Sequence, residues 1–231
     1  MKIDALAVDI DGTLTDSNRL LCIESIKTLR KLEKHNIPVI FVTGNTAAYT
    51  YALTTSIGTT GGVVGENGGV MFKEDYMNNE TIVLGDYEYV NKAYEYLKSE
   101  IDKNIKLKIV EDSYCRLSEI AFYRTMDSEP IKEILEDWDI KIYDSGFALH
   151  LSDKNVNKGK TLKELSKITK IKTKNIMGIG DNENDLEFLD AVGFKVAVSN
   201  AREDLKEKAD YVCEKPYGLG VSEAIEKFIK I

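Results

Sequence analysis

Short runs of almost purely apolar residues alternate along this chain with segments of helical periodicity. The clearest apolar runs end near residues 8, 42, 180 and 198. The intervening segments include residues 23–35, 46–57 and 157–170, where apolar residues recur at helical spacing. A strand that is apolar at every position must be buried on both faces, which is typical of a parallel sheet covered by helices. We therefore expect an α/β fold whose core is a Rossmann-like parallel sheet with helices on both faces.

The pattern changes between residues 81 and 155. Four segments there alternate polar with apolar residues, namely 105–110, 116–123, 140–144 and 147–152. Alternation of this kind predicts an antiparallel sheet with one solvated face, and two helices are expected near residues 87–102 and 128–138. We interpret residues 81–155 as an inserted α+β cap domain, and residues 1–80 and 156–231 as the catalytic core.

Two carboxylates end the first predicted strand. Asp9 and Asp11 are two residues apart, so both side chains leave the strand on the same face. Two ionised carboxylates side by side repel each other, and burial strengthens the repulsion. Each like-charge pair at about 4 Å costs roughly 4 kcal/mol at an effective dielectric constant near 20. A positive group is therefore expected to lie between them.

Further polar residues follow the other core strands. Thr43 comes after the second strand, Lys158 begins a helix, and Asp181 and Asp185 follow the strand that ends at residue 180. Ligands of open α/β sheets bind at the carboxyl ends of the strands, so these side chains should converge. A hard cation with oxygen ligands would balance the carboxylates, and Mg²⁺ suits a site that also receives a phosphate.

The residue types at this edge indicate phosphoryl transfer. Asp9 can attack phosphorus as a nucleophile, and Asp11 can act as the acid and base beside it. Thr43 can donate a hydrogen bond to the phosphoryl oxygens, and Lys158 can balance the charge of nucleophile and phosphate. Asp181 and Asp185 remain to hold the metal, and Asp185 is also placed to orient Lys158.

Four motifs carry a family resemblance. The stretches DIDGT (9–13), FVTGN (41–45), NKGK (157–160) and GDNENDLEF (180–188) resemble, in order, the four motifs of the haloacid dehalogenase superfamily. The insertion resembles the sheet-bearing cap of its Cof-type branch. Within that branch, VTGN followed by the glycine-rich residues 57–69 is similar to the archaeal phosphoglycolate phosphatases.

The resemblance implies a role for each motif residue. Asp9 is the nucleophile, Asp11 the acid and base, and Thr43 and Lys158 are the phosphate ligands. The implied metal ligands are Asp9, Asp11, Asp181 and Asp185, with Asp11 binding through its backbone carbonyl. The implied activity is a magnesium-dependent phosphatase that hydrolyses 2-phosphoglycolate to glycolate and phosphate through an aspartyl-phosphate intermediate.

Other activities stay open at this point. A phosphatase of sugar or cofactor phosphates, a phosphomutase of the same superfamily, and a phosphate-binding protein without turnover would each use the same core. The cap residues that select the leaving group are also open, and the candidates are Arg116, Arg124, Tyr143 and His150.

Three competing motifs fail on their spacing. Gly159-Lys160-Thr161 resembles the end of a P-loop, but Lys154 occupies the earlier glycine position. The third glycine of a dinucleotide-binding fingerprint is replaced by Glu183. The sixth position of a calcium loop that would start at Asp181 holds Leu186 instead of glycine.

Composition limits the partners and the compartment. The net charge of −8 argues against a nucleic-acid surface, which needs a basic stripe. We expect no membrane partner, because no run of about 18 apolar residues occurs. Three scattered cysteines fit a reducing, cytoplasmic setting. The expected partner is a small phosphorylated metabolite, and a homodimer is left open.

Overall fold

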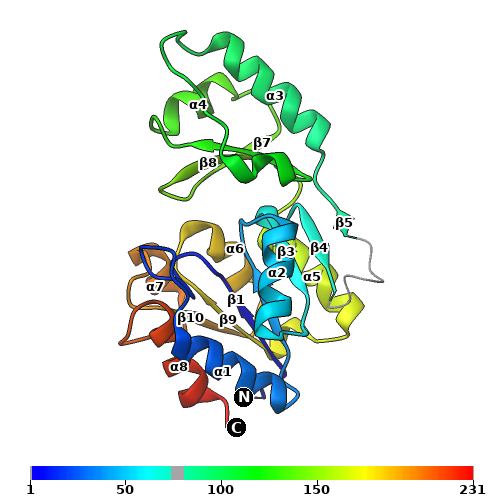
Figure 1. The fold of residues 1–231 in the computed structure, drawn as a ribbon, viewed down its shortest axis with the longest axis vertical. Helices are drawn as coiled ribbons and strands as arrows, with labels where there is room; N and C mark the ends of the chain where they lie inside the picture. Colours follow the sequence, from blue (N-terminus) through cyan, green and yellow to red (C-terminus); the bar gives the residue numbers. More distant parts are fainter. Residues whose placement is uncertain (1, 74–80, 231) are drawn as a thin grey trace.

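The computed structural model describes residues 2–73 and 81–230, and it contains one large sheet and one small one. The large sheet has eight strands in the order β11-β10-β9-β1-β2-β3-β4-β5 (Figure 1). Strands β11 to β3 run parallel, whereas β4 and β5 are antiparallel additions at one edge. The bounds are β1 Ala5–Val8, β2 Val39–Val42, β3 Val63–Gly65, β4 Val70–Phe72, β5 Ile82–Val83, β9 Ile176–Gly180, β10 Phe194–Ala197 and β11 Tyr211–Val212.

The central strands are short and wholly buried. Every residue of β1, β2 and β9 is buried, as the unbroken apolar runs predict for strands covered on both faces. Neighbouring strands of the parallel part are in register from Leu6 opposite Val39 to Val8 opposite Phe41. The carboxyl ends of β1, β2 and β9 therefore lie at the same edge of the sheet.

Helices flank the large sheet, which confirms the expected fold class (Figure 1). Helix α1 contacts α8 and α2, while α5 contacts α6. Two of these core helices begin with a side-chain cap: Thr46 accepts from the Tyr49 N–H at 3.2 Å, and Asn157 accepts from the Lys160 N–H at 2.7 Å. The bounds are α1 Ile23–Lys34, α2 Ala47–Ile57, α5 Lys158–Thr169, α6 Leu186–Leu189, α7 Glu203–Lys208 and α8 Tyr217–Phe228.

The small sheet forms a cap above the large one (Figure 1). Its three antiparallel strands lie in the order β6-β8-β7, and helix α3 packs against β6 and β8. The cap has its own apolar cluster, built around Phe122, Leu97 and Leu149. The bounds are α3 Tyr87–Glu100, β6 Glu119–Tyr123, α4 Glu129–Ile134, β7 Ile140–Asp144 and β8 Ala148–Asp153.

Two details of the predicted cap are wrong. Residues 105–110 do not form a strand: only Ile109 makes an isolated bridge, to Phe122. Their alternating apolar residues instead pack as a loop, with Ile105, Leu107 and Ile109 against the cap cluster. The helix expected over 128–138 ends at Ile134, four residues early, and continues as turns.

The two connections between cap and core are joined by Asp153. One carboxylate oxygen accepts from the backbone N–H of Asp86 at 3.2 Å, and the other accepts from Asn155 at 2.8 Å. The segment that enters the cap and the segment that leaves it are therefore neighbours. No helix within the described part of the chain is long and apolar enough to cross a bilayer.

Candidate active site

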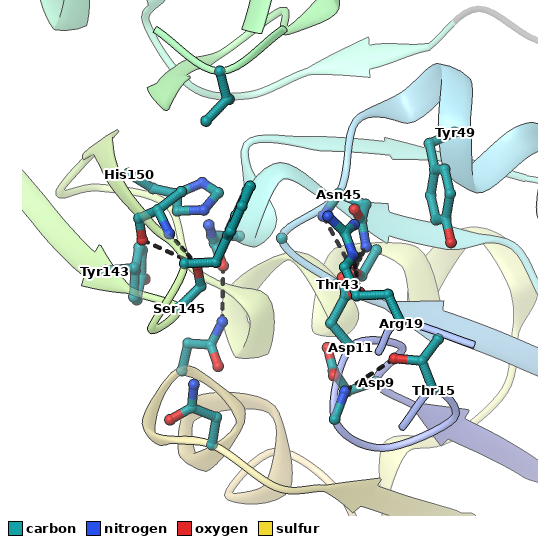
Figure 2. Close-up of a pocket in the computed structure, with 18 of the residues that line it drawn as sticks. Asp9, Asp11, Thr15, Arg19, Thr43, Asn45, Tyr49, Tyr143, Ser145 and His150 are labelled. Carbon is teal, nitrogen blue, oxygen red and sulfur yellow. Dashed lines mark hydrogen bonds and ion pairs between the residues drawn. The ribbon is translucent and has the colours of Figure 1, made fainter. Parts of the chain in front are cut away.

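A cavity of about 600 Å³ lies between the carboxyl edge of the large sheet and the cap. Its core wall includes Asp9, Asp11 and Thr43, whose side chains follow β1 and β2. Figure 2 shows these residues opposite Tyr143 and His150 of the cap. The cavity is therefore lined on one side by the core and on the other side by the cap.

Lys158 does not line the cavity but is buried behind Asp9. Its Nζ donates to Asp9 Oδ1 at 2.9 Å and to Asp185 Oδ1 at 2.6 Å, and the side chain is 1% exposed. Its position at the first turn of α5 is fixed by the Asn157 cap. Since Asp9 Oδ1 is held by Lys158, the cavity receives its other oxygen, which has no hydrogen bond from any described residue.

The second carboxylate oxygen of Asp185 organises the loop after β9. It accepts from the backbone N–H groups of Asp181 at 2.9 Å and Asn182 at 3.0 Å. Asp181 in turn accepts from the Thr13 hydroxyl at 2.6 Å. Gly12, with φ of +83°, allows this approach, because a Cβ there would lie 2.4 Å from Asp181 Oδ2.

These acidic residues form a group that can hold a metal ion. Asp9, Asp181 and Asp185 each offer an oxygen, and the three oxygens lie within 4.8 Å of one another. Burial, followed by repulsion from Asp185, raises the pKa of Asp9 well above its usual value. The same two causes raise the pKa of Asp181 to about 7. A single lysine does not neutralise the group, so the donor set fits a hard divalent cation.

Asp11 lies outside this group. Its Oδ2 accepts from Asn45 Nδ2 at 2.5 Å and its Oδ1 from Arg19 Nε at 3.2 Å. Thr43 Oγ1 accepts from the backbone N–H of Asn45 at 3.1 Å and from its Nδ2 at 3.0 Å. Since both bonds to the Thr43 hydroxyl are accepted ones, its own hydrogen remains available to a bound anion.

A buried glutamate of the core holds the cap loop. Glu66 accepts from the backbone N–H of Leu117 at 2.9 Å, and from the Ser118 N–H at 2.9 Å and hydroxyl at 2.7 Å. Glu66 and Asn67 both have positive φ, of 48° and 52°. Two consecutive left-handed non-glycine residues are strained and persist only where surrounding contacts fix them.

A second buried carboxylate, Glu119 of the cap, lies at the same contact between core and cap. We call this contact the seam, and its residues are Glu66, Asn67, Arg116, Glu119 and His150. Glu119 accepts from Asn67 at 3.0 Å and Ser152 at 2.6 Å, contacts His150 Nδ1 at 2.9 Å, and pairs with Arg116. Burial alone would raise the pKa of Glu119, but His150 and Arg116 outweigh it and lower the pKa to about 2.

The four cap candidates of the sequence separate into two groups. Arg116, Tyr143 and His150 line the cavity, and Tyr143 also donates to Glu187 of α6 at 3.1 Å. Arg124 does not line it and is bound instead to Asp144 and Asp127.

Several cavity residues had no individual signal in the sequence. Arg19 and Asn184 have ordinary residue types and acquire a place in the site only through their contacts with Asp11 and Asn67. Asn45 ends the FVTGN motif but had no role of its own assigned. The glycine-rich residues 57–69, which carry the family resemblance, include Asn67, and Asn67 contacts both Glu119 and Asn184.

Comparison with known proteins agrees with this geometry. The sequence profile of the haloacid dehalogenase-like hydrolases matches residues 6–139 and 78–225, which together span most of the chain. The chain belongs to this family. The core with its inserted cap is thus the arrangement of a haloacid dehalogenase-like hydrolase of the Cof-type subclass, and the predicted family is confirmed.

Similar proteins match over nearly their whole length. A phosphoglycolate phosphatase of Methanobrevibacter smithii is 48% identical, over 99% of this chain and 100% of its own. A phosphoglycolate phosphatase of Methanothermobacter thermautotrophicus is 46% identical, over 97% and 98%. The crystal structure of Thermoplasma acidophilum 0175 superposes with a TM-score of 0.89, at 26% identity and 99% coverage of both chains.

Proposed function

We propose that this hydrolase cleaves 2-phosphoglycolate to glycolate and phosphate, with Mg²⁺ as its metal and an aspartyl-phosphate as its intermediate. The observation that carries the proposal is the convergence of Asp9, Lys158, Asp181 and Asp185 at one edge of the sheet, with Asp11 held separately beside them. The choice of substrate is supported by the full-length similarity to the two archaeal phosphoglycolate phosphatases.

In the first step Asp9 attacks phosphorus through the oxygen that Lys158 leaves free. An Asp9 O–P bond forms while the bond from phosphorus to the glycolate oxygen breaks, and Asp11 gives its proton to that oxygen. Thr43 donates its hydroxyl hydrogen to the phosphoryl group. Lys158 holds Asp9 in the attacking orientation at 2.9 Å.

In the second step water attacks the phosphorus of the aspartyl-phosphate. Asp11, now ionised, takes a proton from the water, and the bond between phosphorus and Asp9 breaks. The product is inorganic phosphate, and both carboxylates return to their starting states. Asn45 orients Asp11 for both proton transfers through its 2.5 Å hydrogen bond.

The proposed metal ligands are Asp9, Asp181, Asp185 and the backbone carbonyl of Asp11. Mg²⁺ bound there would neutralise charge that develops on the phosphoryl oxygens. The raised pKa values of Asp9 and Asp181 support this assignment, because they reflect buried carboxylates that are repelled by Asp185. The proposed division of the chain is a core of residues 1–80 and 156–231 with a cap of residues 81–155, except that β5 (Ile82–Val83) pairs with β4 and extends the core sheet.

The size of the cavity favours a second candidate substrate. About 600 Å³ is more space than a two-carbon phosphate ester fills, so a sugar phosphate would also fit. The two candidates are separated by kcat/KM for 2-phosphoglycolate against a panel of sugar phosphates, p-nitrophenyl phosphate and flavin mononucleotide. Phosphate release is the readout, because a phosphomutase would show little of it. A tenfold preference for any other ester contradicts the proposed substrate.

A further inference from the structure

Three side chains that can carry positive charge line the cavity: Arg19, Arg116 and His150. The proposed substrate carries a carboxylate beyond its ester oxygen, and a buried carboxylate needs a cationic partner. The question is which of the three still has donors to offer.

Arg116 and His150 are bound into the seam between core and cap, and the one Arg116 nitrogen without a partner, Nε, is buried. Arg116 donates to the Gly44 carbonyl at 2.8 Å and to Asp112 at 3.2 Å, pairs with Glu119, and its side chain is 3% exposed. His150 contacts the same Glu119 through Nδ1. Both side chains are therefore held by Glu119 within the protein.

Arg19 is arranged differently. Its side chain is 54% exposed, and its one hydrogen bond to a described residue joins Nε to Asp11 Oδ1. The guanidinium carbon lies 5.8 Å from the centre of the Phe147 ring, which belongs to the cap. The terminal nitrogens have no hydrogen-bond partner in the described part of the chain, so they are free to bind an anion.

The backbone of Arg19 is fixed by a tight turn. Asp16 Oδ1 accepts from the backbone N–H groups of Asn18 at 2.8 Å and Leu20 at 3.0 Å, and the Asp16 carbonyl accepts from Arg19 at 2.9 Å. Arg19 adopts φ of +63°, a left-handed conformation that turns the chain back towards the site. Figure 2 shows the Arg19 side chain beside Asp11.

We propose that the terminal nitrogens of Arg19 bind the carboxylate of the substrate and thereby select phosphoglycolate over neutral phosphate esters. The proposal rests on the proposed function, in which Asp11 protonates the ester oxygen. One methylene separates that oxygen from the carboxylate, so the carboxylate must lie next to Asp11. Arg19 is the cation that contacts Asp11, and its planar fork matches a carboxylate in a bidentate pair.

Phe147 supports this arrangement from the other side of the cleft. Its ring faces the guanidinium, and cation–π contact favours one orientation of the fork. Phe147 is itself packed edge-on against Tyr123, with ring centres 5.2 Å apart. Arg19 is thus held between a core carboxylate and a cap ring before substrate arrives.

The test compares two esters in wild type and Arg19→Gln. Ethyl phosphate replaces the carboxylate of phosphoglycolate with a methyl group. We expect Arg19→Gln to lower the ratio of kcat/KM for phosphoglycolate to kcat/KM for ethyl phosphate at least about 30-fold, because only the charged substrate contacts the fork. The loss of the Nε bond to Asp11 affects both esters alike and cancels in this ratio. Arg19→Lys keeps the charge without the fork and should lose about tenfold for phosphoglycolate.

A direct binding measurement complements the kinetics. Asp9→Asn cannot turn substrate over, so calorimetry on Asp9→Asn and on Asp9→Asn/Arg19→Gln reports phosphoglycolate affinity alone. We expect the second change to weaken binding at least about tenfold. Arg124→Gln is the matched control, since Arg124 is an arginine outside the cavity, and it should leave both esters unaffected.

The outcomes separate the two proposals. If wild type does not prefer phosphoglycolate to ethyl phosphate, the proposed substrate is wrong and the assignment of Arg19 is overturned with it. If wild type does prefer it but Arg19→Gln lowers both esters equally, or neither, only the assignment of Arg19 is overturned. Thermal melting of each variant verifies that it is folded, and Arg19→Lys gives the same comparison should Arg19→Gln melt early.

Discussion

The buried charges of the core and those of the seam beneath the cap are arranged in opposite ways. In the core, Asp9 and two further carboxylates surround Lys158, and negative charge is in excess. In the seam, Glu119 lies between Arg116 and His150 and is compensated. The pKa of Asp9 is accordingly raised by burial and by Asp185, whereas the pKa of Glu119 is lowered to about 2. A buried carboxylate that is paired with cationic side chains stabilises the fold. A group of buried carboxylates with too few cationic partners can instead bind a metal ion.

The largest expected difference between the two regions is in turnover, which a substitution of Asp9 in the core should abolish. Asp9→Asn should lower kcat at least about 1,000-fold, because an amide cannot attack phosphorus. It should not lower the melting temperature of the metal-free protein, since it removes a carboxylate whose ionisation is disfavoured. Steady-state phosphate release and thermal melting check both parts. A folded variant with a tenth of wild-type activity contradicts the role of Asp9.

Metal removal should affect the core alone. An excess of chelator should reduce activity at least about 100-fold, and Mg²⁺ should restore it, because the three carboxylates lack another counter-charge. Mg²⁺ at about 100 times its Kd should also stabilise the fold by about 2.7 kcal/mol, measured as a rise in melting temperature. Asp181→Asn is expected to reduce that rise, and Glu119→Gln to leave it unchanged. Full activity in excess chelator would contradict the metal site.

Substitution of a buried charge in the seam should lower the stability of the fold. Glu119→Gln leaves the buried Arg116 with only the half-exposed Asp112 as its counter-charge, so the free energy of unfolding should fall by about 3 kcal/mol. Denaturant unfolding measures the change. The control is Glu129→Gln, in an exposed pair with Lys132, which should give no measurable change. Equal stability of wild type and Glu119→Gln would remove the distinction between the two regions.

The smallest effect is the pH dependence of stability, which should have opposite signs in the two regions. The pKa of Glu119 is lowered from 4.5 to about 2, so its contribution is present above pH 4.5 and is lost as the pH falls towards 2. The pKa of Asp181 is raised from 3.8 to about 7, so the metal-free protein should lose stability as the pH rises between those values.

Melting temperatures of wild type, Glu119→Gln and Asp181→Asn across pH 2 to 7 measure these two slopes. The gap between wild type and Glu119→Gln should close at low pH. The gap between wild type and Asp181→Asn should open as the pH approaches 7 in chelator, and Mg²⁺ should abolish it. Parallel curves for all three proteins would contradict both assignments.

The core could be predicted from the sequence because its geometry is determined by topology. Wholly apolar strands must be central and parallel, and their carboxyl ends must meet, so Asp9, Thr43 and Asp181 had to converge. The fold class followed from the apolar runs and the family from the four motifs, and both are confirmed. The identity of the metal and the roles of individual residues stay predictions.

The cap and its seam were less predictable for a physical reason. Glu119 gains its partners from Asn67, His150 and Ser152, which are distant in the sequence and ordinary in type. The alternation at residues 105–110 indicated a strand, but an apolar face alone does not supply a neighbouring strand to pair with. Arg19 was overlooked because its significance depends on contact with Asp11 and with Phe147.

The carboxylate of Asp153, which ties the entry and exit of the cap together, has a consequence for how such proteins diversify. An insertion whose two ends meet at one point on its host can be exchanged for another of different size without stretching the host chain. Recombination at this junction would replace the cap side of the cavity in one event while leaving Arg19 and the chemistry of the core intact.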